Sequence, residues 1–440
     1  MSDSPFGINV IGPASANLGI GRATREFASA LMSNGHPVAI FDVDAGGGRS
    51  GFDLSLQGAF VSHLKDLPHA VNLWQLGAFD LPSTALQICA EPDLRNRFNA
   101  GFVWWELPDL PAYMAKAALA FDALIAGSEY VQETARNAVD GVPVLLARHP
   151  TTIPAGVASN RERFNLPQDA LLVYTGFEPR SDPERKNPFA AIEAFTRAFA
   201  GRSDVRLVIK VNNPAAEGRS KEPVERVYRS ASADPRMLIL RDSLSYGDLL
   251  ALYASCDVFI SLHRSEGLGL IPLEAMRLGK PVVVTAWSGN MSYMTHRNSC
   301  PVVFKLMPIT EDAVSYAPSR LGIESSWADP DIDHAAAWLR KLADEPEFRV
   351  EIGRRAAEDS AKYDETARAA EFLHELDALR NHKHVQPAKN HAAIRAALQH
   401  ALGRSRLDRL PPMERFARTV SESVKEALDR HLLWRLRKPQ

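Results

Sequence analysis

The sequence has few of the features that mark several large protein classes. Its 440 residues hold only three cysteines, Cys89, Cys256 and Cys300, which are too widely spaced for a metal-binding pattern or a disulfide framework. We therefore expect a protein of a reducing compartment, the cytoplasm. No stretch approaches the roughly 18 consecutive apolar residues of a membrane-spanning helix. The first ten residues lack the basic and then apolar order of a signal peptide.

The sequence also lacks a large excess of either positive or negative charge. A formal net charge of −2 argues against a generic nucleic-acid binder, because such proteins rely on a surplus of Lys and Arg. The surplus that exists is local: residues 381–440 hold 13 Lys and Arg against 5 Asp and Glu, so the remainder carries −10. Apolar residues every four positions predict a helix over 413–436. This extension could dock on anionic lipid of the inner membrane, pair with another protein, or be a solvated helix.

Strand and helix signals alternate along the chain and predict two α/β domains with parallel sheets. Expected strands include residues 7–11, 37–42, 123–126, 205–211 and 256–263, and expected helices include residues 21–34, 187–200 and 245–255. A segment with three prolines, 149–167, reads as a linker. We therefore predict an N-terminal domain over 1–160, a second domain over 168–378 and the basic helical extension over 381–440. Ligands of such sheets bind outside the C-terminal strand ends.

One stretch, residues 262–288 (LHRSEGLGLIPLEAMRLGKPVVVTAWS), carries the strongest functional signal. Glu266 and Glu274 lie eight residues apart, one in a loop after a predicted strand and one on the following helix. The helix N-terminus offers unpaired N–H groups to a pyrophosphate, and Gly267 and Gly269 let the backbone approach it. Carboxylates roughly 10 Å apart could hold two sugar rings. The alternative is a plain sheet crossover with a glutamate at each edge.

The string His263–Glu266–Gly267–Leu268–Gly269–Leu270, followed by Glu274–Ala275–Met276, Gly279–Lys280–Pro281 and Ser288–Gly289–Asn290, resembles the signature of retaining GT-B glycosyltransferases of group 1, or family four. Their mark is two glutamates separated by seven residues. The resemblance covers roughly residues 5–375 and leaves the extension unexplained. It implies an α/β GT-B fold, in which two Rossmann-like doubly wound domains face each other across a cleft, with acceptor and donor on opposite sides.

The resemblance also implies an activity. A metal-independent, retaining hexosyltransferase would move a hexose from GDP-mannose or a UDP-hexose to a glycan or lipid-linked acceptor in bacterial polysaccharide biosynthesis. The nucleotide sugar would be a co-substrate, and no other cofactor is implied. The resemblance thus implies a cytoplasmic enzyme, and one interpretation of the basic extension places it on the surface of the inner membrane. A catalytically silent GT-B-like scaffold that binds glycans or assembles partners is the alternative, whereas the spacing of the two glutamates fits a glycoside hydrolase poorly.

Roles for single residues follow by analogy on the donor side. Glu266 would hold the transferred sugar and Glu274 the ribose. In residues 176–188 (GFEPRSDPERKNP), Lys186 would neutralise the pyrophosphate, with Arg180 or Arg185 as its partner, because Phe177 stands where many relatives have arginine. The remaining donor-side residues are His263, the backbone of Gly267, Leu268, Gly269 and Leu270, and Gly21.

On the acceptor side, NLGIGRATREFASAL resembles the opening glycine-rich loop of many family members. Arg22 is then a phosphate or acceptor ligand, or a solvated first-turn residue. The long loop before Gly21 and Thr24 in place of a third glycine argue against a dinucleotide fingerprint. In FVWWELPDLP, Trp105 could stack on a sugar or belong to the core. Glu106 stands near where many relatives have a histidine, which leaves acceptor contact, weak base or structural residue open.

Overall fold

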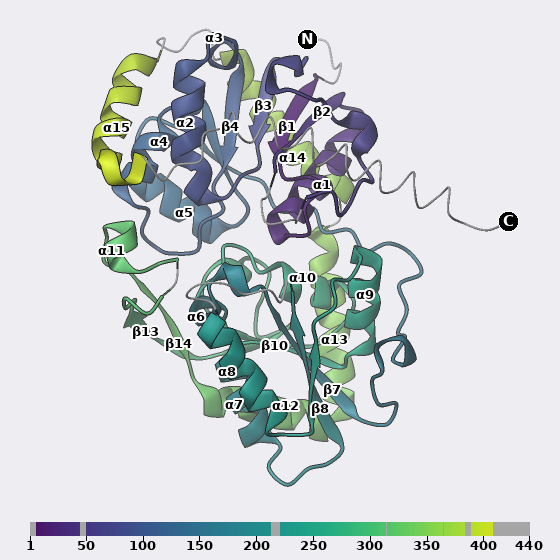
Figure 1. Ribbon diagram of the computed structural model, residues 1–440. Helices are drawn as coiled ribbons and strands as arrows, with labels where there is room; N and C mark the ends of the chain where they lie inside the picture. The colour runs from purple at the N-terminus through teal and green to yellow at the C-terminus, as the bar shows by residue number, and fades with distance from the viewer. Residues whose placement is uncertain are drawn as a thin grey trace, which may run out of the picture. The chain divides into compact units, whose positions relative to one another are not determined.

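The computed structural model describes residues 6–44, 50–212, 221–313, 315–363, 365–382 and 389–407. The chain divides into two compact units (Figure 1). The first comprises Met1–Trp105, Leu110–Pro150 and Tyr363–Gln440, and the second comprises Glu106–Asp109 and Thr151–Lys362. The helix predicted over 413–436 lies outside the described residues.

The first unit is built on a six-stranded sheet in the order β2-β1-β3-β4-β5-β6, with every pairing parallel. Short buried apolar strands alternate with helices, as expected for a sheet covered on both faces. The strands are β1 (Ile8–Gly12), β2 (Val38–Asp42), β3 (Val71–Trp74), β4 (Phe98–Phe102), β5 (Ala123–Ala126) and β6 (Val144–Leu146). The helices among them are α1 (Gly19–Ser33), α2 (Leu81–Ala90), α3 (Pro92–Arg95), α4 (Ala112–Ala118) and α5 (Glu129–Ala138).

The second unit repeats the architecture with the strand order β12-β11-β10-β7-β8-β9, again parallel throughout. Its strands are β7 (Leu171–Phe177), β8 (Val205–Val211), β9 (Met237–Leu240), β10 (Val258–Ser261), β11 (Val282–Thr285) and β12 (Cys300–Val302). Its helices include α6 (Pro183–Lys186), α7 (Pro188–Ala198), α8 (Lys221–Ser232), α9 (Tyr246–Ser255), α10 (Leu270–Arg277), α12 (Ile332–Asp344) and α13 (Pro346–Ser360). A separate antiparallel ribbon pairs β13 (Phe304–Pro308) with β14 (Ser326–Pro330), and α11 (Pro318–Leu321) lies between them in sequence.

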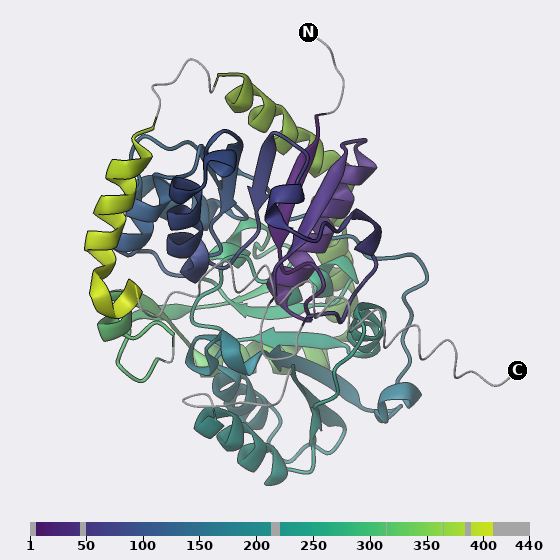
Figure 2. The same ribbon diagram turned by 45° about the horizontal axis from the view of Figure 1, so that its top comes forward.

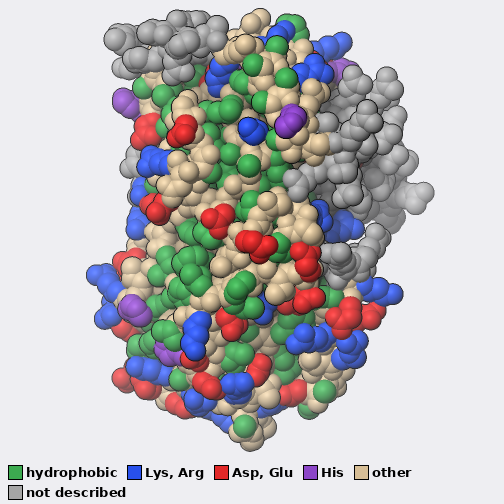
Figure 3. Space-filling model, turned by 90° about the vertical axis from the view of Figure 1, so that its left-hand side faces the viewer, with side chains coloured by type: hydrophobic (Ala, Val, Ile, Leu, Met, Phe, Trp, Pro, Cys, Tyr) green, Lys and Arg blue, Asp and Glu red, His purple; other side chains and the backbone are tan. Residues whose placement is uncertain are grey.

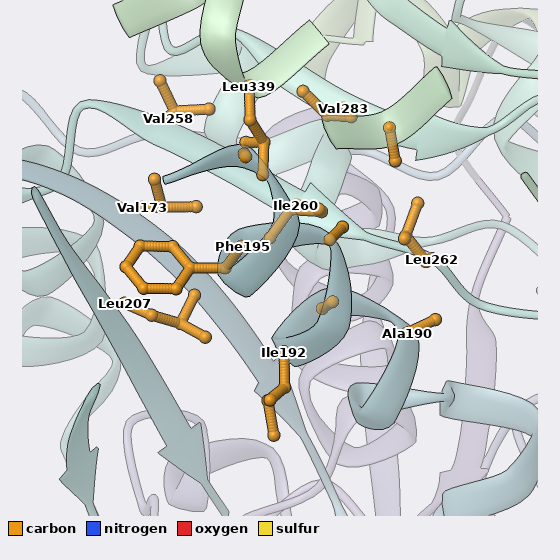
Figure 4. Packing of buried hydrophobic residues seen from close by; sticks show 14 of the residues in the cluster. Val173, Ala190, Ile192, Phe195, Leu207, Val258, Ile260, Leu262, Val283 and Leu339 are labelled. Carbon is orange, nitrogen blue, oxygen red and sulfur yellow. The ribbon is translucent and has the colours of Figure 1, made fainter. Parts of the chain in front are cut away.

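The core of the second unit forms where α7 packs on the sheet. Phe195 and Ile192 of α7 lie with Val173 of β7 and Leu207 of β8, and Leu339 of α12 joins the same cluster (Figure 4). The apolar residues of α7 recur at helical spacing, so one face is buried while Arg197 and Glu193 point to solvent. This packing fixes the strands whose ends carry the candidate site.

The strand order places a topological switch point in each sheet. In the second unit, β7 and β10 are neighbours in the sheet, although two strands, β8 and β9, lie between them in the sequence. In the first unit the corresponding point lies between β1 and β3. Ligands of open α/β sheets bind beyond the carboxyl ends of the strands at such a point. A ligand site of the second unit is therefore expected in the segments that follow β7 and β10.

The C-terminal helices divide between the two units, which differs from the boundaries predicted from sequence. α12 and α13 belong to the second unit, but α14 (Glu365–His382) packs on α1 and β6 of the first. Phe372, Leu373 and Leu376 join the first unit's core, and this apolar face explains why residues 365–378 leave the predicted second domain.

The described part of the predicted extension is likewise integrated in the first unit. α15 (His391–Leu407) packs along α2 and α4 (Figure 2), with Leu398 and Leu402 buried. Lys389, just before it, donates to the carbonyls of Leu119 and Phe121. Within the described ranges, no helix is both long and apolar enough to cross a bilayer.

Charged side chains of both signs lie side by side on the face of the molecule in Figure 3. Surface ion pairs of the second unit illustrate the mixing: Arg197 contacts Glu193 and Asp333, and Arg202 contacts Asp204 and Asp344. Such exposed pairs contribute about 0–1 kcal/mol each. The surface charge is thus balanced locally, in keeping with the small net charge of the chain.

Candidate functional site

The segment after β7 forms a tight one-turn helix, α6, that presents Arg185 and Lys186. Asp182 caps it at φ 63°, accepting the backbone N–H groups of Glu184 and Arg185 at 3.1 and 3.4 Å. Asn187 ends it at φ 48° and caps the next helix, and its amide donates to the carbonyl of Leu262 at 3.0 Å. Asx residues tolerate the left-handed region, and proline is favoured at the first helical position that follows each cap. The SDPERKNP string therefore fixes the direction of its two basic side chains.

The segment after β10 carries Glu266 and leads into α10. Gly269, at φ 84°, precedes α10, and no side chain caps that helix. Gly289 packs against this loop so closely that a Cβ there would lie 2.0 Å from the carbonyl oxygen of Gly267. The N–H of Glu266 donates to Ser288 Oγ at 2.8 Å, and the N–H of Gly289 donates to the carbonyl of Glu266. The Ser288–Gly289–Asn290 segment thus holds the Glu266 loop.

The two segments meet at the switch point in an ion cluster. Lys186 Nζ donates to Glu266 Oε1, and Arg185 Nη1 lies 3.1 Å from Glu266 Oε2. The Arg185 side chain is only 2% exposed and also donates to the carbonyls of Ser265 at 2.8 Å and Ser181 at 3.1 Å. Residues predicted to bind the sugar and the pyrophosphate are therefore in direct contact.

The electrostatics of this cluster favour its charged form. Burial by itself raises the pKa of Glu266, but Lys186 and Arg185 outweigh burial and lower it to about 2. Burial lowers the pKa of Lys186, and Glu266 partly opposes that effect. Burial also acts to lower the pKa of Arg185, yet Tyr316, Glu106 and Glu266 together hold it above its usual value. Glu266 therefore stays a carboxylate at neutral pH.

The structure separates the two candidate arginines. Arg185 is buried and bound to Glu266, Ser265 and Ser181, whereas Arg180 is exposed within a short 3₁₀ turn, Pro179–Ser181. Arg185 can orient its neighbours but offers little to an incoming ligand. Of the two arginines, Arg180 is the one that solvent reaches, and Lys186 is 21% exposed beside them.

Glu106 contacts the same cluster from a segment distant in sequence. Its Oε2 accepts the Tyr316 hydroxyl at 2.6 Å, and its Oε1 lies 3.5 Å from Arg185 Nη2. Glu106–Asp109 belongs to the second unit, unlike the tryptophans that precede it. The predicted acceptor-side pair Trp105 and Glu106 is therefore split between the two units.

Glu274 lies on α10, where the sequence predicted it. It is 1% exposed, and the Tyr246 hydroxyl of α9 lies 3.4 Å from its Oε1. Seven residues separate it from Glu266. The strand, loop and helix expected from residues 256–279 are confirmed, including Gly279 at φ 69° just after the helix. Leu268 is buried, and Leu270 is the first helical residue.

His263 is fully buried and lies close enough to Glu266 for the two groups to interact electrostatically. Burial lowers its pKa to about 4, so the ring is neutral at pH 7. Asn290 lies beside it, but neither ring nitrogen makes a hydrogen bond of good geometry to a described residue. Thr285 Oγ1 and Asn290 Oδ1 are likewise buried and make no hydrogen bond to a described residue. This group of unpaired polar atoms near the ends of β10 and β11 is unusual, since buried polar atoms are normally paired.

In the first unit, the predicted residues of the glycine-rich loop have structural partners. A Cβ on Gly21 would lie 2.5 Å from the Ala16 carbonyl oxygen, so close packing alone requires glycine there. Arg22 is 8% exposed, and its Nε and Nη2 donate to Glu26 Oε1 at 3.0 and 2.7 Å. The alternative that Arg22 is a solvated first-turn residue is therefore wrong. His149 lies 3.4 Å from Glu26, and burial lowers its pKa to about 3.

Trp105 is part of the core, with no exposed surface, and packs edge-on against Phe79. Trp104 is partly exposed instead, stacked on Phe102, with its indole N–H donating to Gln75 Oε1 at 3.1 Å. The Gln75 side-chain nitrogen is buried and makes no hydrogen bond within the described residues. Of the two tryptophans, Trp104 is the one that a ligand at the carboxyl ends of β3 and β4 could reach.

Sequence reasoning missed Tyr316, Tyr246, Gln75 and Trp104 as members of these two constellations. No local motif marks the two tyrosines, because they reach the cluster through tertiary packing. Ser288 and Gly289 were part of the quoted signature, and their support of Glu266 gives that motif a physical reason. No group of three or more His, Cys, Asp or Glu is placed to bind a metal in the described ranges, and metal independence stays a prediction.

Comparison with known proteins identifies the second unit's sheet as the matched region. Residues 171–305 match the family model for glycosyl transferases group 1. The serotype-specific mannosyltransferase WbdA of Escherichia coli is 32% identical over 126 residues, covering 28% of this chain and 14% of WbdA. A GDP-mannose-dependent phosphatidylinositol monomannoside mannosyltransferase of Corynebacterium glutamicum is 26% identical over 241 residues, covering 50% of this chain and 59% of that protein. Each match spans less than two thirds of the relative.

A likeness over most of the chain comes from solved structures. Anabaena HepE, in a complex with UDP-glucose, superposes with a TM-score of 0.60 over 85% of this chain and all of its own, at 13% identity. Such an identity is informative about fold alone. The two parallel six-stranded sheets with their helices match the GT-B fold, as predicted. The sheet of the second unit is therefore similar to glycosyl transferases group 1, and the chain has the GT-B fold.

Proposed function

We propose that the chain is a retaining hexosyltransferase that uses a nucleoside diphosphate sugar, with GDP-mannose as the first candidate donor. The observation that carries the proposal is the contact of Lys186 with Glu266 at the β7–β10 switch point, one loop before Glu274 on α10. A residue proposed to bind phosphate and one proposed to bind the sugar would thus be adjacent where a nucleotide sugar is expected. The two mannosyltransferase relatives favour a mannose donor over a UDP-hexose.

The chemistry requires positive charge at the departing diphosphate. Lys186 and the exposed Arg180 would supply it, together with the uncapped first turn of α10. Glu266 would accept hydroxyl groups of the transferred sugar, and Glu274, oriented by Tyr246, those of the ribose. Neither Glu266 nor Glu274 is assigned as a nucleophile. Retention would therefore come from attack of the acceptor hydroxyl on the same face of the sugar from which the diphosphate departs, with a donor phosphate oxygen taking the acceptor's proton.

The acceptor would be a glycan or lipid-linked saccharide held by the first unit. Trp104 and the side-chain amide of Gln75, at the carboxyl ends of β4 and β3, are the groups that suit a sugar ring, through stacking and a hydrogen bond. Arg22 and Trp105, proposed from sequence, are committed to Glu26 and to the core, which supports Trp104 in their place.

The proposal is tested with purified protein against GDP-mannose, UDP-glucose, UDP-N-acetylglucosamine and UDP-galactose. Thermal shift and acceptor-free donor hydrolysis are measured for the wild type and for Lys186→Ala, Arg180→Ala and Glu274→Ala. A matched control is Arg197→Ala, an exposed arginine of the same unit. Losing a charge-assisted hydrogen bond should lower turnover by roughly one to two orders of magnitude, with no effect in the control.

The outcomes separate the candidate functions. One donor that stabilises the protein and is hydrolysed, with loss in the three site variants, supports the transferase and identifies the sugar. Folded protein that responds to none of the four donors contradicts the proposal and favours the silent scaffold. Equal losses in Arg197→Ala and in the site variants would show that the effects do not arise at this site.

A further inference from the structure

Four residues that follow β4 in sequence are built into the second unit. The hydroxyl of Ser265 donates to the carbonyl of Glu106, and the hydroxyl of Ser325 donates to Asp109 Oδ2 at 2.8 Å. The segment Glu106–Asp109 is therefore anchored at both ends to the unit that carries the donor residues. Its first residue directly contacts the ion cluster.

The Glu106 carboxylate is engaged on both oxygens. Oε2 accepts the Tyr316 hydroxyl at 2.6 Å and Oε1 lies 3.5 Å from Arg185 Nη2. The ring of Tyr316 lies 5.6 Å from the Arg185 guanidinium carbon and is itself buried. Next to it in sequence, the N–H of Ser315 donates to Asp182 Oδ2, the cap of α6, at 2.7 Å. Tyr316 and Glu106 thus enclose the side of Arg185 that faces away from Glu266.

Arg185 transmits this arrangement to Glu266. Its planar guanidinium places Nη1 on Glu266 and Ser265 while Nη2 faces Glu106 and Ser181. A rigid fork cannot shift toward one carboxylate without moving away from the other. Two basic side chains, Arg185 and Lys186, face two acidic ones, Glu106 and Glu266, so removal of either acid leaves excess positive charge in a buried site.

We propose that Glu106 and Tyr316 are positioning residues of the donor site, which hold Arg185 so that Arg185 and Lys186 fix Glu266 toward the transferred sugar. This inference rests on the proposed function of the site. It assigns Glu106 neither to acceptor contact nor to proton transfer, because both of its oxygens are already engaged by Tyr316 and Arg185. It also explains why a segment of the N-terminal half is packed into the second unit.

The pH dependence of turnover distinguishes this role from a merely structural one. The groups that face Glu266 are Lys186 and Arg185 from α6 and His263 from the end of β10; Glu106, Tyr316 and Asp182 act on it through Arg185. Burial raises the pKa of Glu266, and the two cations lower it. If Arg185 loses its position, its lowering effect weakens, and the pKa of Glu266 moves upward. The acid side of the pH–rate profile should then move to higher pH.

The experiment compares Glu106→Gln, Tyr316→Phe and the double variant in acceptor-free hydrolysis of the donor found in the screen. The pH range extends from about 8 down to the lowest pH at which the variants stay folded, because the pKa of Glu266 is about 2. Each single substitution keeps the shape and removes one link of the chain. We expect each to lower kcat about tenfold, the equivalent of one hydrogen bond to a charged group, and to move the acid limb upward. The double variant should be no worse than the more affected single, because both act through Arg185. Glu193→Gln, an exposed glutamate of the same unit that lies outside the cluster, is the matched control.

Three results would overturn the inference. Unchanged kcat and pH profile in folded Glu106→Gln and Tyr316→Phe would remove the positioning role. Normal hydrolysis with a raised KM for acceptor alone would make Glu106 an acceptor contact. If the wild type hydrolyses no donor, the proposed function itself fails. In that case, non-additive losses of unfolding free energy in Glu106→Gln and Tyr316→Phe would show that the two residues have a structural role alone.

Discussion

The carboxyl edges of the two sheets have similar architecture but gather their charged residues in different ways. In the first unit, Arg22 meets Glu26 one turn away on the same helix. In the second unit, Arg185 and Lys186 meet Glu266, Glu106 and Tyr316, which come from three other segments of the chain. A local pair forms with its helix, whereas the dispersed cluster forms only when the whole unit is folded. The second edge is therefore the more sensitive to single substitutions.

Arg185→Met should have the largest effect on stability. It removes the shared partner of Glu266 and Glu106 from a buried site, which costs about 3–5 kcal/mol. Arg22→Met breaks the local pair with Glu26 and should cost about 1–3 kcal/mol. Urea unfolding of the two variants beside the wild type measures both. A loss for Arg22→Met equal to or above that for Arg185→Met would contradict the contrast between dispersed and local charges.

Substitution of the tight glycines should have an intermediate effect on stability and a clear difference in activity. A Cβ would lie 2.0 Å from the Gly267 carbonyl in Gly289→Ala and 2.5 Å from the Ala16 carbonyl in Gly21→Ala. Each should cost about 1–3 kcal/mol through overpacking. Only Gly289→Ala displaces the Glu266 loop, so its donor hydrolysis should fall tenfold or more, about 1.4 kcal/mol or more in barrier. Comparable hydrolysis in the two folded variants would refute that distinction.

Acidification should give the smallest effect, and in both units. The folded-state pKa values of His149 and His263 are lowered to about 3 and about 4, chiefly by burial. The unfolded chain therefore binds more protons below about pH 6.5, so the stability contributed by the neutral rings is lost as pH falls from there. The gap in unfolding free energy between the wild type and His149→Gln, or His263→Gln, should narrow between pH 7 and 5. A gap that stays constant would show that these rings do not titrate as buried neutral groups.

The sequence predicted those parts of the fold whose signals are local. The strands around residues 123–126 and 205–211, the helices near 187–200 and 245–255, and the strand–loop–helix around Glu266 and Glu274 all occur where expected. The return of α14 to the first unit was not predicted, because the affinity of its apolar face for one core or the other depends on three-dimensional complementarity. α2 was not predicted either, although Pro82 in its first turn and a buried apolar face were available signals.

The same limit applies to the candidate site. Motif spacing brought Lys186, Glu266 and Glu274 to attention, and the structure places Lys186 against Glu266. The choice between Arg180 and Arg185 depends on burial, and the choice between Trp104 and Trp105 depends on which ring faces the core. Neither follows from neighbours in the sequence. Glu106 was noticed as a departure from a family pattern, but its partners lie about 80 and 210 positions away in the chain.

The placement of Glu106–Asp109 has a consequence for how the protein is made. During synthesis this segment leaves the ribosome long before Arg185, Glu266 and Tyr316, so the first sheet can form while Glu106 has no counterpart. The ion cluster can close only after residue 316 has emerged, and the first unit is completed later still, when α14 returns to it. A fragment restricted to residues 151–362 would lack one of the cluster's four charges. The two units are therefore separate in structure but not in biosynthesis, and neither is a contiguous segment of the chain.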